Sequence, residues 1–420
     1  MRTVSSVIAA CLTSIMAVGG YAESIAAWHN SSKEFTVKGT TSVDVSISEP
    51  MVVAVAAEQV GWGFHQFPTI ARWKDGRLAV TYNMARDAAE SYGLPTPVMV
   101  SSDEGETWKP HTGALGVAGL LLPNGDRIEI STPRPYKTNG LRLPEPITPG
   151  TSQFRLHELP PKLRTIRISR IEKGSSERIV QHASLFDPQA LRGGGPEIFP
   201  IIWWGDMRVA SDGSVIAGIY PGRYIRDDGT VEPKCCVFFY RSTDFGRSWK
   251  IQGRIPYEFD LKADPKGDKR GGFTEPAFEI LKDGTFLCIA RTTDGNGIGP
   301  MYASRSKDLG RTWSKPEALT PNGVLPRLLR LENGVLVLAS GRPGVQLRFS
   351  TDGKGKRWTD PCELGPITSS NLGADTCGYT SLLATGPDTF LIAYSHFKHS
   401  NEKGELRKAI LVREVRVKRR

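Results

Sequence analysis

The chain has 420 residues, of which 44 are glycine and 29 are proline, and 39% of its residues are hydrophobic. This length excludes a small module that needs disulfide bonds to fold, and the number of turn-forming residues excludes a helical bundle. Lysine and arginine number 54 against 44 aspartate and glutamate residues, a formal net charge of +10 at pH 7, which is compatible with an acidic partner without identifying one.

The N-terminal residues have the pattern of a secretory signal. Arg2 precedes an apolar run from Val4 to Val18, and small residues follow at Gly20 and Ala22, the two positions that a signal peptidase recognises. The sequence therefore predicts a signal peptide over residues 1–22 and a secreted or periplasmic protein. A lipid-attachment box ending at Cys11 is the weaker alternative, because too short an apolar stretch precedes it. No later run approaches the ~20 apolar residues of a membrane-spanning helix.

The cysteines do not form a recognisable framework. Once the signal peptide is removed, five remain: Cys235, Cys236, Cys288, Cys362 and Cys377. An odd, scattered set without metal-ligand spacing argues against a disulfide scaffold and against a zinc site. His396 and His399 lack a third ligand, so we expect neither a metal nor a cofactor.

A short phrase recurs six times along the chain: an apolar run, Asp-Gly or Asn-Gly, and a second apolar run. Such dipeptides between β-rich runs are strong hairpin signals, because both central positions favour positive φ. The predicted turns lie near Asp75, Asn124, Asp212, Asp283, Asn333 and, in a weaker form, Asp388. Six hairpins predict six sheets.

A second repeat falls between these hairpins. It reads SSDEGETW from Ser101, STDFGRSW from Ser242, SKDLGRTW from Ser306 and, in a stretched form, STDGKGKRW from Ser350. In such a turn the aspartate accepts backbone N–H groups, glycine adopts the left-handed conformation and tryptophan packs onto the sheet. Copies in register with the hairpins indicate a repeat architecture.

This repeat resembles the Asp-box, S-x-D-x-G-x-[ST]-W, of the sialidase superfamily, and the resemblance covers about residues 60 to 400. It implies an all-β fold, a six-bladed β-propeller of four-stranded antiparallel blades around a central channel. We expect a single propeller over residues 23–420.

Two parts of the ring depart from the regular pattern. Residues 134 to 195 make the second blade irregular, with a proline-rich loop and then RTIRISRI and ERIVQHAS as its outer strands. The C-terminal run KAILVREVRV and a strand near Val43 to Ala56 should share one blade and close the ring. The basic residues between Arg413 and Arg420 are interpreted as a solvated tail, because like-charge runs usually remain in water.

Antiparallel strand order locates a possible site. The start of the first strand and the end of the second lie at the same end of each blade, opposite the hairpin. Polar residues at these places should therefore meet over the channel mouth: His65, Gln66, Asn83, Arg86, Asp87, Tyr220, Arg223, Glu275, Arg291, Arg327, Arg342, Tyr379 and His396. The Asp-box aspartates fall at the opposite end, and we interpret them as structural.

Arginines beside a glutamate and a tyrosine fit the capture and cleavage of an acidic sugar. Guanidinium groups bind a carboxylate bidentately. A glutamate can take the proton of a tyrosine so that the phenolate attacks the anomeric carbon. A neutral attacking group avoids repulsion from the carboxylate of the substrate, and tyrosine nucleophiles are the known exception among glycoside hydrolases.

The resemblance to sialidases implies a role for several of these residues. Tyr379 in CGYTSLL corresponds to the family's nucleophile, and Glu275 in TEPAFEILKDG to the glutamate that activates it. Arg291 and Arg342 resemble two arginines of the carboxylate-binding triad. Arg86 resembles an additional arginine after the first blade. The general acid is expected from the same loop, with Asp87 as the first candidate and Glu90 as the second.

One position departs from the family. Sialidases open the first blade with Arg-Ile-Pro, and the arginine belongs to the triad, whereas this chain has Gln66-Phe67-Pro68. A neutral amide forfeits a charge-assisted contact worth roughly 1.5 to 3 kcal/mol. Either Arg327 or Arg223 replaces the missing arginine, or the substrate is not sialic acid.

Three functions follow from the sequence. The first is a secreted, retaining exo-glycosidase of sialidase type that acts on a glycan with an acidic terminal sugar. The second is another propeller enzyme, a hydrolase or a lyase, that acts on a different acidic or neutral polysaccharide. The third is a glycan-binding propeller without catalysis. We expect no nucleic-acid partner, because the chain has no P-loop and no nucleic-acid-binding motif.

Overall fold

The computed structural model describes residues 33–130, 134–148, 152–193, 197–198, 206–219, 222–293, 297–365, 367–368 and 371–420. The predicted signal peptide, Cys11 and Tyr220 lie outside this part of the chain. The described elements are β-strands and a few short 3-10 helices, and no helix among them has the length and apolar character needed to cross a membrane.

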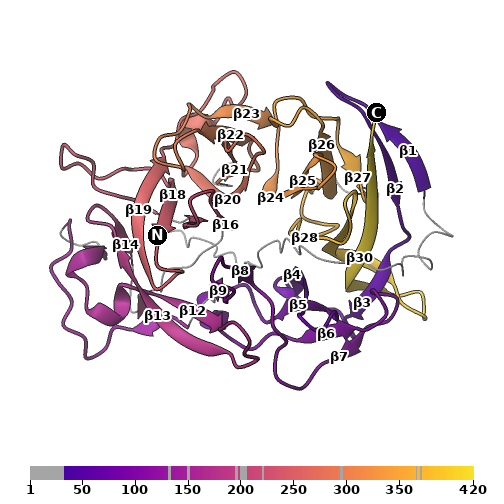
Figure 1. The fold of residues 1–420 in the computed structure, drawn as a ribbon, viewed down its shortest axis with the longest axis horizontal. Helices are drawn as coiled ribbons and strands as arrows, with labels where there is room; N and C mark the ends of the chain where they lie inside the picture. Colours follow the sequence, from indigo (N-terminus) through magenta and orange to yellow (C-terminus); the bar gives the residue numbers. More distant parts are fainter. Residues whose placement is uncertain are drawn as a thin grey trace.

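Three blades are regular four-stranded antiparallel sheets in chain order, arranged around a ring (Figure 1). The first consists of β4 (Phe64–Arg72), β5 (Leu78–Met84), β6 (Val98–Ser101) and β7 (Lys109–Pro110). The fourth consists of β20 (Phe273–Ile280), β21 (Phe286–Thr292), β22 (Met301–Ser306) and β23 (Glu317–Thr320). The fifth consists of β24 (Val324–Arg330), β25 (Leu336–Gly341), β26 (Val345–Ser350) and β27 (Cys362–Glu363).

The second and third blades form one eight-stranded sheet. The second blade consists of β8 (Leu120–Leu121), β9 (Arg127–Ile130), β12 (Thr165–Ile171) and β13 (Ile179–Phe186). The third consists of β16 (Met207–Val209), β17 (Val215–Ile219), β18 (Val237–Ser242) and β19 (Ser248–Ile255). The outer strands of the two blades, β13 and β19, pair in parallel, with Leu185 opposite Trp249. Each outer strand thus covers an edge that would otherwise be exposed.

Short elements lie beside this sheet. They are β10 (Tyr136–Lys137), which pairs with β15 (Glu197–Ile198), and β11 (Gln153–Arg155), which pairs with β14 (Leu191–Gly193). The 3-10 helices are η2 (Ala89–Ser91), η3 (Leu156–Glu158), η4 (Pro161–Leu163) and η5 (Gly267–Lys269).

The sixth blade joins both ends of the described chain. Its strands are β28 (Thr380–Ala384), β29 (Thr389–Ser400) and β30 (Leu406–Arg419), and two N-terminal strands, β2 (Val43–Ile47) and β3 (Met51–Val55), pair with β30. A further strand, β1 (Lys33–Val37), pairs with β2. The predicted closure of the ring is therefore present.

The interpretation of the C-terminal basic run as a solvated tail is wrong. Residues Arg413 to Arg419 belong to β30, where Val415 and Val417 are fully buried and the charged side chains alternate with them. Arg413 donates to the hydroxyl of Tyr394 at 3.0 Å. The period of two in this segment is the signal of a half-buried strand, and it outweighs the charge of the run.

The Asp-box turns join the third and fourth strands and satisfy their own polar groups. In the first copy, Asp103 accepts hydrogen bonds from the hydroxyl of Ser101 at 2.7 Å and from the backbone N–H of Thr107 at 2.9 Å. Asp244 and Asp308 accept the equivalent bonds. Burial raises the pKa of Asp103 and Asp308, but these hydrogen bonds outweigh it and lower both pKa values to about 2. The aspartates thus have the structural role expected of them.

Apolar and aromatic side chains fill the space between neighbouring blades. Phe239 of β18 packs against Phe278 of β20, with ring centroids 5.4 Å apart, and stacks on Trp313 at 4.2 Å. The five cysteines of the described chain are free thiols, so the fold is held by this packing and by the strand ladders.

Candidate active site

The same backbone feature occurs in the first strand of three blades. Phe67 in β4, Glu275 in β20 and Leu325 in β24 have φ of 55°, 48° and 39°, each directly before a proline and at an irregularity in the strand register. Positive φ is unfavourable for residues with a Cβ and is typical of functional sites. A bulge of this kind redirects a side chain out of the regular alternation of the strand.

Glu275 is the only one of these three residues that carries a charge, and it binds Tyr379 and Arg291. The hydroxyl of Tyr379, which immediately precedes β28, donates to Oε1 of Glu275. Nη1 of Arg291, at the end of β21, lies 2.7 Å from the same oxygen and 3.2 Å from the Tyr379 hydroxyl. The other glutamate oxygen accepts the backbone N–H of Leu325 at 2.9 Å. Strands of the fourth, fifth and sixth blades thus fix one tyrosine–glutamate–arginine group.

This group is shielded from solvent. Tyr379 and Glu275 are each 1% exposed and Arg291 is 4% exposed. Burial, and then the negative charge of Glu275, raise the pKa of Tyr379 well above its ordinary value, while Arg291 and Arg342 act in the opposite direction. Tyr379 is therefore a neutral phenol at rest, with its proton on the bond to Glu275.

A second set of residues connects Tyr379 to Asp87. Arg342 directly follows β25, and its guanidinium lies 6.0 Å from the ring centroid of Tyr379 and 5.3 Å from that of Trp62. Its Nε donates to the carbonyl of Cys377 at 3.1 Å. The indole N–H of Trp62 donates to Oδ2 of Asp87 at 2.9 Å. Asp87 is thus held in place by a ring that also contacts Arg342.

Aromatic and apolar residues line the remaining side of the group. The ring of Phe67 meets that of Tyr379 edge-on at 5.0 Å. Tyr92, in the loop after η2, is buried in the same cluster as Leu325 and Cys377. Neither Trp62 nor Tyr92 was expected at the site. A tryptophan between Gly61 and Gly63, next to a predicted site strand, was the available signal for Trp62.

Gln66 lies where the resemblance to sialidases implies an arginine. Its side chain is completely buried, and within the described part of the chain neither its amide nitrogen nor its amide oxygen has a hydrogen-bond partner. The neighbouring His65 packs against the ring of Tyr82 at 5.3 Å, and burial lowers its pKa. Both residues are therefore uncharged at neutral pH.

Within the described part of the chain, no side-chain hydrogen bond or ion pair joins Arg327 or Arg223 to the tyrosine–glutamate–arginine group. Nε of Arg327 donates to the carbonyl of Thr380 at 3.3 Å, and its Nη1 lies 3.7 Å from Asp206. Asp206 also faces Arg208, which pairs with Glu279 at 3.2 Å, so Arg327 belongs to a buried ion network of the inner strands.

For three further predicted residues, the described chain shows no side-chain contact with the tyrosine–glutamate–arginine group. Arg223 and Arg86 are exposed, and no side-chain hydrogen bond or ion pair joins either of them to another residue of the described chain. His396, expected at the end of a strand, lies within β29, which continues to Ser400. Of the predicted residues, Tyr379, Glu275, Arg291, Arg342 and Asp87 are therefore the ones connected by contacts.

Comparisons with known proteins concern the fold. No protein-family model and no curated protein sequence matches the chain. Among solved structures, a protein of unknown function from Dyadobacter fermentans is 17% identical, with a TM-score of 0.58 over 89% of this chain and 99% of that one.

Two sialidases are also similar. A point mutant of the NanB sialidase from Streptococcus pneumoniae is 12% identical, with a TM-score of 0.53 over 89% of this chain and 71% of that one. The Hadza microbial sialidase Hz136 is 17% identical, with a TM-score of 0.50 over 84% of this chain and 66% of that one. These similarities, together with the Asp-box turns, show that the chain has the six-bladed β-propeller fold of the sialidases.

Proposed function

We propose that this protein is a retaining exo-glycosidase that removes an acidic terminal sugar, with Tyr379 as nucleophile and Glu275 as its base. The observation that carries the proposal is the buried contact among Tyr379, Glu275 and Arg291. A glutamate bound to a tyrosine hydroxyl is arranged to accept its proton, which is the requirement for an activated nucleophile. The similarity of the fold to two sialidases supports the same conclusion.

In the first step, Glu275 accepts the phenolic proton and the phenolate oxygen attacks the anomeric carbon. The bond from that carbon to the glycosidic oxygen breaks, and Asp87 donates a proton to the leaving oxygen. Arg291 stabilises the phenolate as charge develops on it, because its Nη1 already lies 3.2 Å from the tyrosine oxygen. The product is a covalent glycosyl-tyrosine.

In the second step, Asp87 removes a proton from water and the water oxygen attacks the anomeric carbon. The bond to the tyrosine oxygen breaks, and Glu275 returns its proton to the phenolate. Two displacements at one carbon give net retention of configuration. Both carboxyl groups end the cycle in the protonation state in which they began.

An acidic sugar fits the charges of the site. Arg342 lies over the ring of Tyr379 with one face toward Trp62, so it is positioned to bind a carboxylate next to the anomeric carbon. A neutral nucleophile does not repel such a substrate. Gln66 contributes an uncharged amide where sialidases have an arginine, so we propose a sialic acid or a related acidic sugar bound by fewer charge-assisted contacts.

The proposal is tested with fluorogenic glycosides of sialic acid, of a uronic acid and of a neutral hexose. Cleavage of one of the two acidic substrates, lost in Tyr379→Phe, is the expected result. Tyr394→Phe is the matched control, because Tyr394 is a buried tyrosine that binds Arg413 instead of a carboxylate.

Two results would contradict the proposal. Ultraviolet absorbance of an unsaturated product from a uronic-acid polymer, without hydrolysis of either acidic glycoside, would identify a lyase. Glycan binding with no turnover of any substrate would identify a binding propeller.

A further inference from the structure

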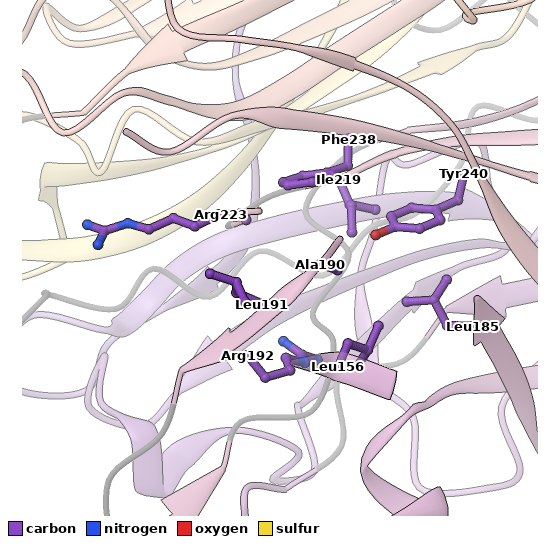
Figure 2. A pocket seen from close by; sticks show the side chains of 10 residues that line it. Leu156, Leu185, Ala190, Leu191, Arg192, Ile219, Arg223, Phe238 and Tyr240 are labelled. Atoms are coloured by element: carbon purple, nitrogen blue, oxygen red, sulfur yellow. The ribbon is translucent and has the colours of Figure 1, made fainter. Parts of the chain in front are cut away.

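A pocket lies between the third blade and the small sheet formed by β11 and β14 (Figure 2). Tyr379, Glu275 and Arg291 are not among the residues that line this pocket. The walls come from η3, from β13 and β14, and from β17 and β18, and they are mainly apolar. The lining residues used below are Leu156, Leu191, Arg192, Gly222, Arg223 and Tyr240.

Two arginines line the pocket, and Arg192 is the one whose guanidinium group lies among apolar side chains. Its guanidinium lies beside Leu156 and Leu191, whereas that of Arg223 points away from the other labelled side chains (Figure 2). The Nε and Nη2 atoms of Arg192 are buried, and no group of the described chain accepts a hydrogen bond from them. These two nitrogens form one edge of the guanidinium, the edge that binds both oxygens of a carboxylate side-on.

The carboxylate of Asp187, which lies near Arg192, is already bound to other groups. Asp187, Arg254 and Arg192 all act electrostatically on Tyr240. Asp187 pairs with Arg254 at 2.6 Å and accepts the hydroxyl of Tyr240 at 2.9 Å, so its charge is balanced without Arg192. Burial lowers the pKa of Arg192 to about 10, which leaves it cationic at neutral pH. Within the described part of the chain no carboxylate pairs with Arg192, so an anion that reached its Nε and Nη2 atoms would stabilise the cation.

We propose that Arg192 binds the carboxylate of an acidic glycan, in a subsite separate from the Tyr379 site. The pocket is too small for a sugar ring, so in this proposal the carboxylate alone enters it and the ring stays outside. One wall also leads towards Tyr379: the carbonyl of Gly222 accepts the N–H of Cys236 at 3.0 Å, and Cys235 packs against the apolar cluster around Tyr379. The assignment of the carboxylate to a glycan rests on the proposed function. The binding of a carboxylate by Arg192 does not depend on that function.

Calorimetric titration of the full chain with glucuronate, glucose and acetate tests this subsite. Arg192→Met should weaken glucuronate binding by about ten- to a hundredfold, because a charge-assisted bidentate contact is lost. Arg155→Gln is the matched control, since Arg155 lies on β11 of the same small sheet and pairs with Glu158 at 3.6 Å. The affinity of Arg155→Gln for glucuronate should equal that of the original protein.

Thermal unfolding shows whether Arg192→Met loses glucuronate binding because a contact is missing or because the variant is unfolded. Without ligand, Arg192→Met should melt at a higher temperature than the original protein, because it removes a cation whose buried Nε and Nη2 atoms have no hydrogen-bond partner in the described chain. Glucuronate should then raise the melting temperature of the original protein and not that of the variant.

Equal glucuronate affinity in the original protein and Arg192→Met would overturn the inference. Equal affinity for acetate and glucuronate would show a small-anion site and overturn its glycan part. Tyr379→Phe should retain the Arg192-dependent binding. If no glycoside is cleaved while that binding persists, the proposed function fails and carboxylate capture by Arg192 stands.

Discussion

The two ends of the propeller use repetition differently. At the Asp-box end, Asp103, Asp244 and Asp308 make the same hydrogen bonds in three blades, and each bond is internal to its turn. At the channel mouth, the positive-φ position before proline also recurs in three blades, but it holds Phe67, Glu275 and Leu325. The backbone repeats at both ends, whereas the side chain repeats at only one.

This difference separates stability from chemistry. Residues that recur with the same contacts stabilise each blade alone, so their loss should affect folding and leave the chemistry unchanged. At the mouth, Glu275 binds Tyr379, whereas Phe67 and Leu325 at the equivalent positions are apolar, and Gln66 beside Phe67 has a buried amide without a partner in the described chain. The loss of Glu275 or Gln66 should affect activity more than folding.

The largest expected effect is that of Glu275→Gln. The amide cannot accept the phenolic proton, so kcat should fall by about 10²- to 10⁴-fold, the usual contribution of general acid–base catalysis. The variant should also melt at a lower temperature, because the amide has one acceptor oxygen for the three donors that the carboxylate binds and removes the negative charge that pairs with buried Arg291. Steady-state kinetics on the best acidic substrate, with a melting curve, measures both. Unchanged kcat would remove Glu275 from the mechanism.

Asp244→Ala should lower the stability of the protein and leave kcat unchanged. It deletes acceptors for Ser242, the N–H of Ser248 and the Ser248 hydroxyl, so we expect a loss of about 2 to 3 kcal/mol in the free energy of unfolding. Denaturant titration measures this loss, and kcat at a temperature where the variant is folded should match that of the original protein. A large fall in kcat with unchanged stability would contradict the separation of the two ends.

Gln66→Leu tests whether an unpartnered group at the mouth is there for a ligand. Removing a buried amide that has no partner should raise the free energy of unfolding by about 1 kcal/mol. If the amide binds substrate, KM should rise at the same time while kcat changes little. Greater stability with unchanged KM would make Gln66 a packing residue.

The smallest expected effect is on the stability of the protein at low pH. The pKa of Asp103 and Asp308 falls from 3.8 to about 2 on folding, so each carboxylate contributes stability that is complete above pH 3.8. This contribution decreases as the pH falls from 3.8 to about 2, because the unfolded chain then binds more protons than the folded one. Melting temperatures across this range should decrease less in Asp103→Asn than in the original protein. Identical pH profiles would argue against the hydrogen bonds as the cause.

The fold could be predicted where the sequence repeats. Asn-Gly, Asp-Gly and Asp-box signals are local, and the turns at Asp75 and Asp308 lie between paired strands as expected. The parallel pairing of β13 with β19 had no local signal, because it joins strands whose register is set only by packing. The run KAILVREVRV was correctly predicted as a strand, whereas the interpretation of the overlapping residues Arg413 to Arg420 as a solvated tail weighed charge above alternation.

The site was predictable for the same reason and to a similar extent. Strand order places Glu275, Arg291 and Tyr379 at one end of the ring, and they meet there. The positions of Trp62 and Tyr92 depend on loops, whose conformations follow no short period. The sequences around Phe67, Glu275 and Leu325 share a proline at the next position, but nothing in the sequence indicates that φ is positive there.

Ring closure by β30 has a consequence for synthesis of the chain. Asp44 in β2 and Arg420, which meet in the sixth blade, are separated by 376 residues. During translation, β2 and β3 are made before the other blades and have no partner until β30 emerges. Their unpaired edges are open to pairing with other chains throughout that interval. A nascent chain halted before Leu406 should therefore be more prone to aggregation than the completed one.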